Sequence, residues 1–267
     1  MNEQIVVDGL KVNYSLTGHG HPVLILHGWG SRSNAWLNVQ NKLSENSSFK
    51  IIIPDLIGFG QSDLPKIGWN MDNYVDWLEL FIIELSSRHP EFKNPIFLMG
   101  HSFGGRISVK AAARGIIPIK GLVLCGAAGL KSETSIKLQI ISDIAKSASR
   151  FIDRVHLDRL KTYMRDFYYH LLRQNDYLNV PRVMRDTFRK VIEEDLTVYL
   201  PAIRQKTLIV WGAEDRVVPV KQAYRFHQGI IDSKLEVIPC VGHSPQLERP
   251  DELAEILLNF FKACNYK

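Results

Sequence analysis

A serine, a carboxylate and a histidine each follow a predicted strand in this chain, and these three side-chain types can together catalyse acyl transfer. Ser102 lies in the segment GHSFGG over residues 100–105, between an apolar run that ends at Met99 and a helical pattern. Small residues around Ser102 permit a sharp strand-to-helix turn with a strained serine at its apex. We therefore predict that Ser102 is a nucleophile.

A serine hydroxyl needs an imidazole to accept its proton and a carboxylate to orient that imidazole. His243 lies in a glycine-flanked turn after the last predicted strand, and Glu214 and Asp215 follow the strand before it. The carboxyl ends of parallel strands lie at one edge of a sheet, so Ser102, Asp215 and His243 can meet there. The alternatives are a structural turn histidine at 243 and a helix-capping role for either acid.

An oxyanion formed at Ser102 needs two backbone N–H donors. The helix behind Ser102 starts with Phe103, whose amide is the first expected donor, and Trp29 in the loop after an early strand supplies the second. We expect His27 in that loop to be a buried, hydrogen-bonded histidine that shapes it. His27, His101 and His243 lack the spacing of a metal-binding motif, so neither a metal nor a cofactor is expected.

Short apolar runs alternate with helical patterns through most of the chain, which indicates a mostly parallel sheet covered on both faces. A hairpin is expected around Asp8 and Gly9, and Asp72 is the expected cap of a long helix. Further strands are predicted at 23–26, 51–53, 95–99, 121–125, 207–211 and 235–238, and helices at 34–43, after Val220 and at 251–262.

Residues 131–200 change this rhythm, because they contain no strand-like run and their apolar residues recur at helical spacing. We predict a helical insertion in a core domain made of residues 1–130 and 201–267. A solvated helical face explains its many arginines better than an arginine that binds an acidic substrate, which remains the alternative. These arginines include Arg150, Arg154, Arg159, Arg173, Arg185 and Arg189.

The composition requires neither a nucleic-acid partner nor a membrane span. The 267 residues are 45% hydrophobic and carry 33 basic against 28 acidic side chains, which is a mixed surface rather than a basic block. The sequence shows no apolar run of membrane-spanning length and no signal peptide, so we expect a cytoplasmic protein, either a monomer or a homodimer. Cys125, Cys240 and Cys264 are scattered, and we expect them to be reduced.

Five segments in order resemble the motifs of the α/β-hydrolase superfamily. They are HGWG at 27–30, PDLIGFGQSD at 54–63, GHSFGG at 100–105, WGAED at 211–215 and GH at 242–243. The resemblance implies an eight-stranded α/β-hydrolase fold with a helical cap, and it favours Asp215 over Glu214 as the third member of the triad. Serine at the elbow departs from the haloalkane dehalogenase and epoxide hydrolase branches, which makes those reactions unexpected.

The resemblance implies two-step acyl transfer, and our first expectation is hydrolysis of a carboxylic ester with a small to medium acyl chain. Hydrolysis of a carbon–carbon bond in a vinylogous diketone, or of an N-terminal proline peptide, would use the same fold and triad. A ligand receptor that keeps the triad but turns over slowly is the alternative of another class.

Overall fold

The computed structural model describes residues 2–45, 48–131 and 181–265. The chain divides into two compact units, one formed by residues 1–129 and 181–267 and the other by residues 130–180. Most of the predicted cap, including Arg150, Arg154, Arg159 and Arg173, lies outside the described residues. Within the predicted cap range, residues 181–200 are described and belong to the first unit.

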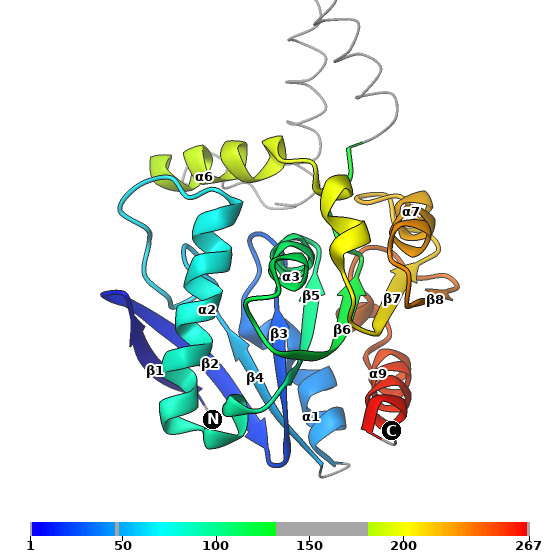
Figure 1. Cartoon of the computed structure of the whole chain (residues 1–267), viewed down its shortest axis with the longest axis horizontal. Coiled ribbons are helices and arrows are strands. Elements are labelled where there is room, and N and C mark those ends of the chain that lie inside the picture. Colours follow the sequence, from blue (N-terminus) through cyan, green and yellow to red (C-terminus); the bar gives the residue numbers. More distant parts are fainter. Residues whose placement is uncertain (1, 46–47, 132–180, 266–267) are drawn as a thin grey trace, which may run out of the picture. The chain divides into compact units, whose positions relative to one another are not determined.

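The first unit is built on one eight-stranded sheet in the order β1-β2-β4-β3-β5-β6-β7-β8 (Figure 1). β2 is antiparallel to β1 and to β4, and all other neighbouring strands are parallel. The predicted α/β-hydrolase fold with a mostly parallel sheet is thereby confirmed. The strands are β1 (Asn2–Val7), β2 (Leu10–Gly18), β3 (His21–Leu26), β4 (Phe49–Pro54), β5 (Ile96–His101), β6 (Ile119–Cys125), β7 (Thr207–Gly212) and β8 (Ser233–Ile238).

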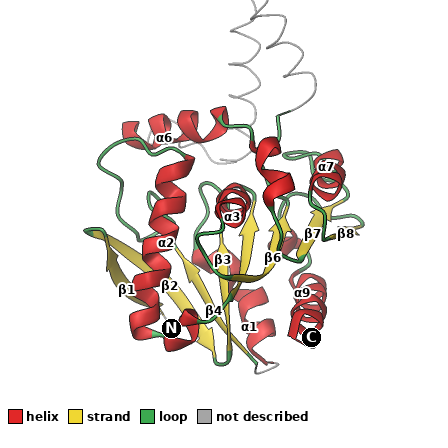
Figure 2. Cartoon of the chain, viewed as in Figure 1, coloured by secondary structure: helices red, strands yellow, loops and turns green. Residues whose placement is uncertain are grey.

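Helices cover both faces of the sheet, with α1 and α9 on one face and α2 and α3 on the other (Figure 2). The α-helices are α1 (Leu37–Glu45), α2 (Met71–Arg88), α3 (Phe103–Arg114), α6 (Arg182–Glu193), α7 (Lys221–Gly229), α8 (Pro245–Glu248) and α9 (Pro250–Asn265). Short 3₁₀ helices are η1 (Ser33–Trp36), η2 (Pro90–Lys93) and η4 (Leu196–Ala202).

The continuous apolar runs of the central strands are explained by burial on both faces. Val23 and Ile25 of β3 belong to the core cluster beneath α1 and α9. Leu24 and Leu26 are equally buried, and the alternation of side chains along a strand directs them to the opposite face. Because both faces are dry, polar side chains can be placed only where the strands end, and the carboxyl ends carry the chemistry.

Two helix starts differ from the sequence-based expectation. The N-cap of α2 is Asn70, whose side chain accepts from the Asn73 amide while the Asn73 side chain accepts from the Asn70 amide. This reciprocal pair satisfies the free amides, so the prediction of Asp72 as the cap was wrong. The helix predicted at 34–43 is split into η1 and α1, and η1 buries Ser33 and Trp36.

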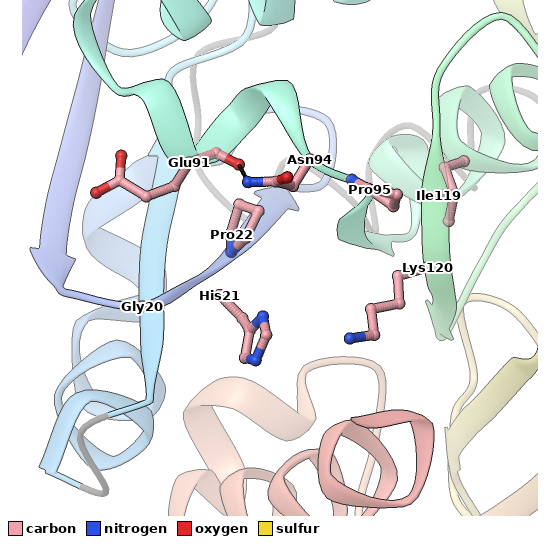
Figure 3. A pocket seen from close by; sticks show the side chains of 8 residues that line it. All are labelled: Gly20, His21, Pro22, Glu91, Asn94, Pro95, Ile119 and Lys120. Atoms are coloured by element: carbon pink, nitrogen blue, oxygen red, sulfur yellow. Dashed lines mark hydrogen bonds between the residues drawn. The ribbon is translucent and has the colours of Figure 1, made fainter. Parts of the chain in front are cut away.

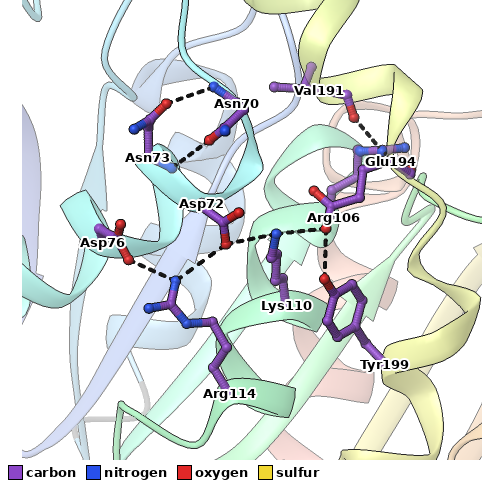
Figure 4. Close-up of polar contacts among 10 residues, drawn as sticks. All are labelled: Asn70, Asp72, Asn73, Asp76, Arg106, Lys110, Arg114, Val191, Glu194 and Tyr199. Atoms are coloured by element: carbon purple, nitrogen blue, oxygen red, sulfur yellow. Dashed lines mark hydrogen bonds and ion pairs between the residues drawn. The ribbon is translucent and has the colours of Figure 1, made fainter.

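Charged side chains join α3 to α2 and to the end of α6 (Figure 4). Lys110 of α3 lies between two carboxylates, with Nζ 2.8 Å from Asp72 Oδ1 and 2.6 Å from Glu194 Oε1. Arg106 donates through Nη2 to the carbonyls of Val191 and Glu194. Both basic side chains are almost fully buried, so removal of one partner would leave a buried charge and loosen α6 from α3.

No helix among the described residues is both long and apolar enough to span a bilayer.

Candidate active site

Ser102 occupies a sharp turn between β5 and α3. Its backbone has φ 52° and ψ −109°, a conformation that residues other than glycine rarely adopt. The neighbouring glycines make this turn possible, because a Cβ on Gly104 would lie 2.2 Å from the Leu26 carbonyl oxygen and one on Gly100 2.4 Å from the Gly104 carbonyl oxygen. The predicted strained serine is therefore found, and Ser102 is 2% exposed.

Asp215 and His243 form a hydrogen-bonded pair at the same edge of the sheet. Asp215 follows β7 and His243 follows β8, and His243 Nδ1 lies 2.8 Å from Asp215 Oδ2. The second Asp215 oxygen, Oδ1, accepts from the amides of Val217 and Val218 at 2.9 and 2.8 Å. The two amides fix the orientation of the carboxylate, whose Oδ2 then accepts a proton carried on His243 Nδ1.

The other ring nitrogen of His243, Nε2, is buried and has no hydrogen-bond partner among the described residues. The His243 ring lies near the elbow, because the His101 ring, directly before Ser102, lies 4.9 Å from it between centroids. His101 Nε2 also lies 2.8 Å from the His243 carbonyl oxygen. A lone pair on a buried nitrogen beside a serine turn is suited to accept a proton.

Glu214, the alternative acid, does not reach His243. Its side chain is exposed, and its backbone amide donates to the Val241 carbonyl at 2.8 Å. The capping alternative also finds no support, because α7 has Val220 as its N-cap and no side-chain cap. The structure thus brings Asp215, and not Glu214, to the histidine.

The loop after β3 is joined to the elbow through the backbone. The Gly104 amide donates to the His27 carbonyl at 3.1 Å. A Cβ on Gly28 would lie 3.3 Å from Ser102 Cβ, which puts the loop directly beside the serine. Among the described residues, the amides of Trp29 and Phe103 make no hydrogen bond, as is required of donors that wait for a substrate oxygen.

His27 is fully buried with both ring nitrogens in use. Nδ1 donates to the Gly28 carbonyl at 2.7 Å, and Nε2 accepts from the Leu56 amide at 2.9 Å. Burial lowers the pKa of His27 to about 4, so the ring is neutral at neutral pH. It shapes the loop, as the sequence predicted.

Asp55 connects three separate segments around this loop. Its Oδ1 accepts from the Ser33 amide at 2.7 Å, and its Oδ2 accepts from the Gln61 amide at 2.9 Å and from Asn13 Nδ2 at 3.1 Å. Asp55 is 2% exposed, so these donors compensate for the burial of its charge. The PDLIGFGQSD segment at 54–63 is therefore a structural support of the site.

Aromatic rings surround the Trp29 side chain. Trp29 packs edge-on against Phe59, Phe103 and Phe188, at centroid distances of 4.8, 5.2 and 5.0 Å. Phe188 comes from α6, and all four rings belong to the first unit. We call these four residues the aromatic wall, and it gives the surroundings of the elbow an apolar character.

The charged residues of α6 leave the aromatic wall apolar. Arg185 and Arg189 are exposed, which agrees with the solvated face that the sequence favoured for them.

Among the described residues, no group of three histidine, cysteine or acidic side chains is arranged to hold a metal ion. The cysteines are free, and Cys125 is buried with its pKa raised by burial and by the charge of Asp215.

A depression of about 650 Å³ lies near the start of β3 and β6 (Figure 3). Ser102 follows the other, carboxyl end of the parallel strand β5. The lining of the depression includes His21, Glu91 and Lys120. These residues do not include Ser102, Asp215 or His243, so this depression is separate from the candidate active site.

Sequence reasoning missed two contacts that hold His243. One is His101, which occupies the variable position of the serine motif, and the other is Glu248, whose carboxylate accepts from the amides of Gly242 and Ser244. Neither has a spacing signal, because the partners are brought together only by the folded sheet and by α8.

Known proteins are similar to this chain over most of its length. The sequence model of the alpha/beta hydrolase fold family matches residues 21–250. The chain is 27% identical to a 2-hydroxy-6-oxo-6-(2'-aminophenyl)hexa-2,4-dienoic acid hydrolase of Metapseudomonas resinovorans, over 94% of this chain and 88% of that protein. It is also 27% identical to a 2-hydroxy-6-oxo-2,4-heptadienoate hydrolase of Pseudomonas putida, over 98% of this chain and 97% of that protein.

Solved structures extend the comparison to an esterase of Exiguobacterium antarcticum. That structure is 25% identical, has a TM-score of 0.73, and is matched over 98% of this chain and 100% of its own. The family match covers most of the chain, and the sheet order and the strained elbow serine are those expected of the fold. The protein belongs to the alpha/beta hydrolase fold family and is an enzyme of that family.

Proposed function

We propose that the protein is a serine hydrolase that cleaves a carboxylic ester through an acyl-enzyme formed on Ser102. The observation that supports this most is the Asp215–His243 hydrogen bond of 2.8 Å, which leaves His243 Nε2 buried and unpartnered among the described residues. This nitrogen is therefore available to accept the proton of a serine hydroxyl.

The proposed reaction begins when Ser102 Oγ attacks the substrate carbonyl carbon and His243 Nε2 takes the hydroxyl proton. The carbonyl oxygen becomes an oxyanion that accepts from the amides of Trp29 and Phe103. When the intermediate collapses, the carbon–oxygen bond of the ester breaks and His243 gives its proton to the leaving alcohol. Asp215 orients the ring and stabilises the imidazolium through its hydrogen bond to Nδ1.

Water then completes the cycle. His243 accepts a proton from a water molecule that attacks the acyl carbon, and the same two amides bind the second oxyanion. Collapse returns the proton to Ser102 Oγ and releases the carboxylic acid. Each oxyanion donor is expected to contribute about 3 kcal/mol to stabilisation of the transition state. No step requires a cofactor.

The aromatic wall supports an apolar acyl group of small to medium size. Trp29 and Phe103 carry the proposed oxyanion donors on their backbones and present aromatic side chains to the same region. An acyl chain bound beside them would bury its methylene groups against Phe59 and Phe188.

A second function, hydrolysis of a carbon–carbon bond, is supported by the two relatives named above. Their names describe hydrolases of 2-hydroxy-6-oxo-dienoate compounds, which carry a ketone in place of an ester. The same serine attack on a ketone would break a carbon–carbon bond, and the leaving group would take its proton at carbon. The esterase structure supports the first function to a similar degree.

A substrate panel separates these two functions. Wild type, Ser102→Ala and the control Ser87→Ala would be assayed on p-nitrophenyl esters of increasing chain length and on a 2-hydroxy-6-oxo-dienoate. Ser87 lies exposed near the end of α2 and tests for general effects of serine removal. Ester turnover that Ser102→Ala abolishes and Ser87→Ala retains supports the first function.

Faster Ser102-dependent cleavage of the dienoate would assign the second function instead. Cleavage of N-terminal proline peptides in preference to both would contradict both functions. Thermal stabilisation by a ligand without Ser102-dependent turnover would replace the hydrolase proposal with a receptor.

A further inference from the structure

A buried histidine, His101, packs against the residue proposed as the base. His101 is the last residue of β5, directly before Ser102, and is 4% exposed. Its Nε2 lies 2.8 Å from the carbonyl oxygen of His243, and the two rings pack with an interplanar angle of 44°. The Trp36 ring packs edge-on against the His101 ring with centroids 6.0 Å apart.

The proton of His101 can be assigned from its surroundings. A carbonyl oxygen only accepts, so Nε2 must carry a proton to make this contact. Nδ1 has no partner among the described residues and faces the backbone of Gly28, where an added Cβ would lie 3.0 Å from it. A second proton on Nδ1 would be buried without an acceptor. Burial and the nearby His243 ring accordingly lower the pKa of His101 to about 3.

We propose that His101 is a positioning residue, which holds the peptide of His243 and so keeps the His243 ring beside the turn of Ser102. This proposal rests on the function proposed above. The Nε2–H of His101 fixes the His243 carbonyl, and with it the direction in which the His243 side chain leaves the backbone. Because His101 and Ser102 are consecutive, one rigid turn then positions both the nucleophile and the base.

The other contacts of His243 leave this role open to His101. Asp215 holds the ring at Nδ1, and Glu248 holds the amides of Gly242 and Ser244 on either side. The described contacts of the His243 carbonyl itself include one hydrogen bond, from His101. The ionisable groups around His101 are His243 and His27, with Asp215 beyond His243.

The first test uses the wild-type protein. Long-range ¹H–¹⁵N spectra of protein labelled in its histidine rings would report the proton position of each ring, with the His101 signals assigned from the His101→Gln spectrum. We expect a proton on Nε2 and none on Nδ1 of His101 throughout pH 5 to 8. A proton on Nδ1, or a doubly protonated ring in this range, would overturn the proposal whatever the protein catalyses.

The second test separates positioning from structure. His101→Leu removes the donor and keeps an apolar side chain, whereas His101→Gln keeps an N–H donor of similar reach. His89→Leu, which removes a buried histidine that contacts Tyr14 outside the site, is the matched control. We expect His101→Leu to lower kcat about 10- to 100-fold with KM within about twofold, and His101→Gln to recover most of kcat.

Equal losses of kcat in both His101 variants, or none in either, would overturn the positioning role. If the wild type lacks Ser102-dependent turnover, the proposed function fails and kcat cannot be compared. The NMR signals of the His243 ring in the two His101 variants then replace kcat as the readout of the second test. Signals that move in His101→Leu and return in His101→Gln support the contact. Signals unchanged in His101→Leu refute it.

Discussion

His27 and His243 follow two strands of the same sheet at the same edge, yet their ring nitrogens are used differently. Both nitrogens of His27 are hydrogen-bonded within the loop after β3, and the ring is fully buried. His243 has one nitrogen paired with Asp215, while Nε2 is buried without a partner among the described residues. The first arrangement stabilises the fold, whereas the second stores an unsatisfied lone pair.

This difference indicates how the fold separates stability from reactivity. A buried polar atom without a partner costs about 1–3 kcal/mol, so the unpaired Nε2 lowers the stability of the fold while it leaves a proton acceptor free. His27 and Asp55 hold the loop that carries Trp29, and they leave the amide of Trp29 free of described partners. Side chains whose hydrogen-bonding groups are all paired thus hold in place the groups that are left free for a substrate.

The largest expected effect comes from the reactive histidine. His243→Asn removes the proposed base, and we expect kcat to fall about 10⁵-fold or more. The unfolding temperature should change by less than about 4 °C, because Asp215 is the one described side chain that loses a hydrogen-bond partner. His227→Asn, on the exposed side of α7, is the control. Retention of a tenth of the activity in His243→Asn would contradict its role as the base.

Asp215→Asn tests the partner of that histidine. The asparagine oxygen can still accept from the amides of Val217 and Val218, but its NH₂ group would face Nδ1 and favour the wrong tautomer of His243. We expect kcat to fall about 10⁴-fold with little change in KM. Glu214→Gln should stay within about twofold of wild type. Comparable losses in both variants would show that the acid was wrongly assigned.

His27, the structural histidine, should instead affect the pH dependence of the free energy of unfolding. Burial lowers the pKa of His27 to about 4, from 6.5 for an unperturbed ring, so the unfolded chain binds a proton more readily than the folded one. The contribution of neutral His27 to the free energy of unfolding is full above about pH 6.5 and is lost as the pH falls toward 4. Urea unfolding between pH 7 and 4 should show a loss about 3 kcal/mol smaller in His27→Gln than in wild type. An identical pH dependence would exclude a neutral, buried His27.

Much of this comparison could be predicted from the sequence. The apolar strand runs, the glycines around Ser102 and the turn of His243 fix which groups reach the carboxyl edge, because parallel strands place all of these ends together. The apolar stripe of α2 was also predictable, since its residues recur at helical spacing. The structure buries all of them. They are Tyr74, Trp77, Leu78, Phe81, Ile82 and Leu85.

What could not be predicted depends on competition between neighbours or on tertiary contact. Asn70, Asp72 and Asn73 are all able to cap a helix, and only the folded loop decides that the two asparagines pair. His101 lies at a motif position where any residue fits, so its contact with the His243 carbonyl has no signature. Metals and helix caps have spacing rules, whereas contacts between loops 142 residues apart do not.

The smallest expected effect concerns the outer support of His243. Glu248 accepts from the Gly242 amide at 2.7 Å and from the Ser244 amide at 3.0 Å, and its side chain lies at the surface. Glu248→Gln keeps one acceptor and turns an NH₂ group toward the other amide, so we expect a loss of about 1 kcal/mol in unfolding free energy and a fall in kcat of about threefold. Glu252→Gln, exposed in α9, is the control. Since His101 and Asp215 would still hold His243, a loss of activity as large as that of Asp215→Asn would mean that the loop, rather than the paired carboxylate, decides where the imidazole lies.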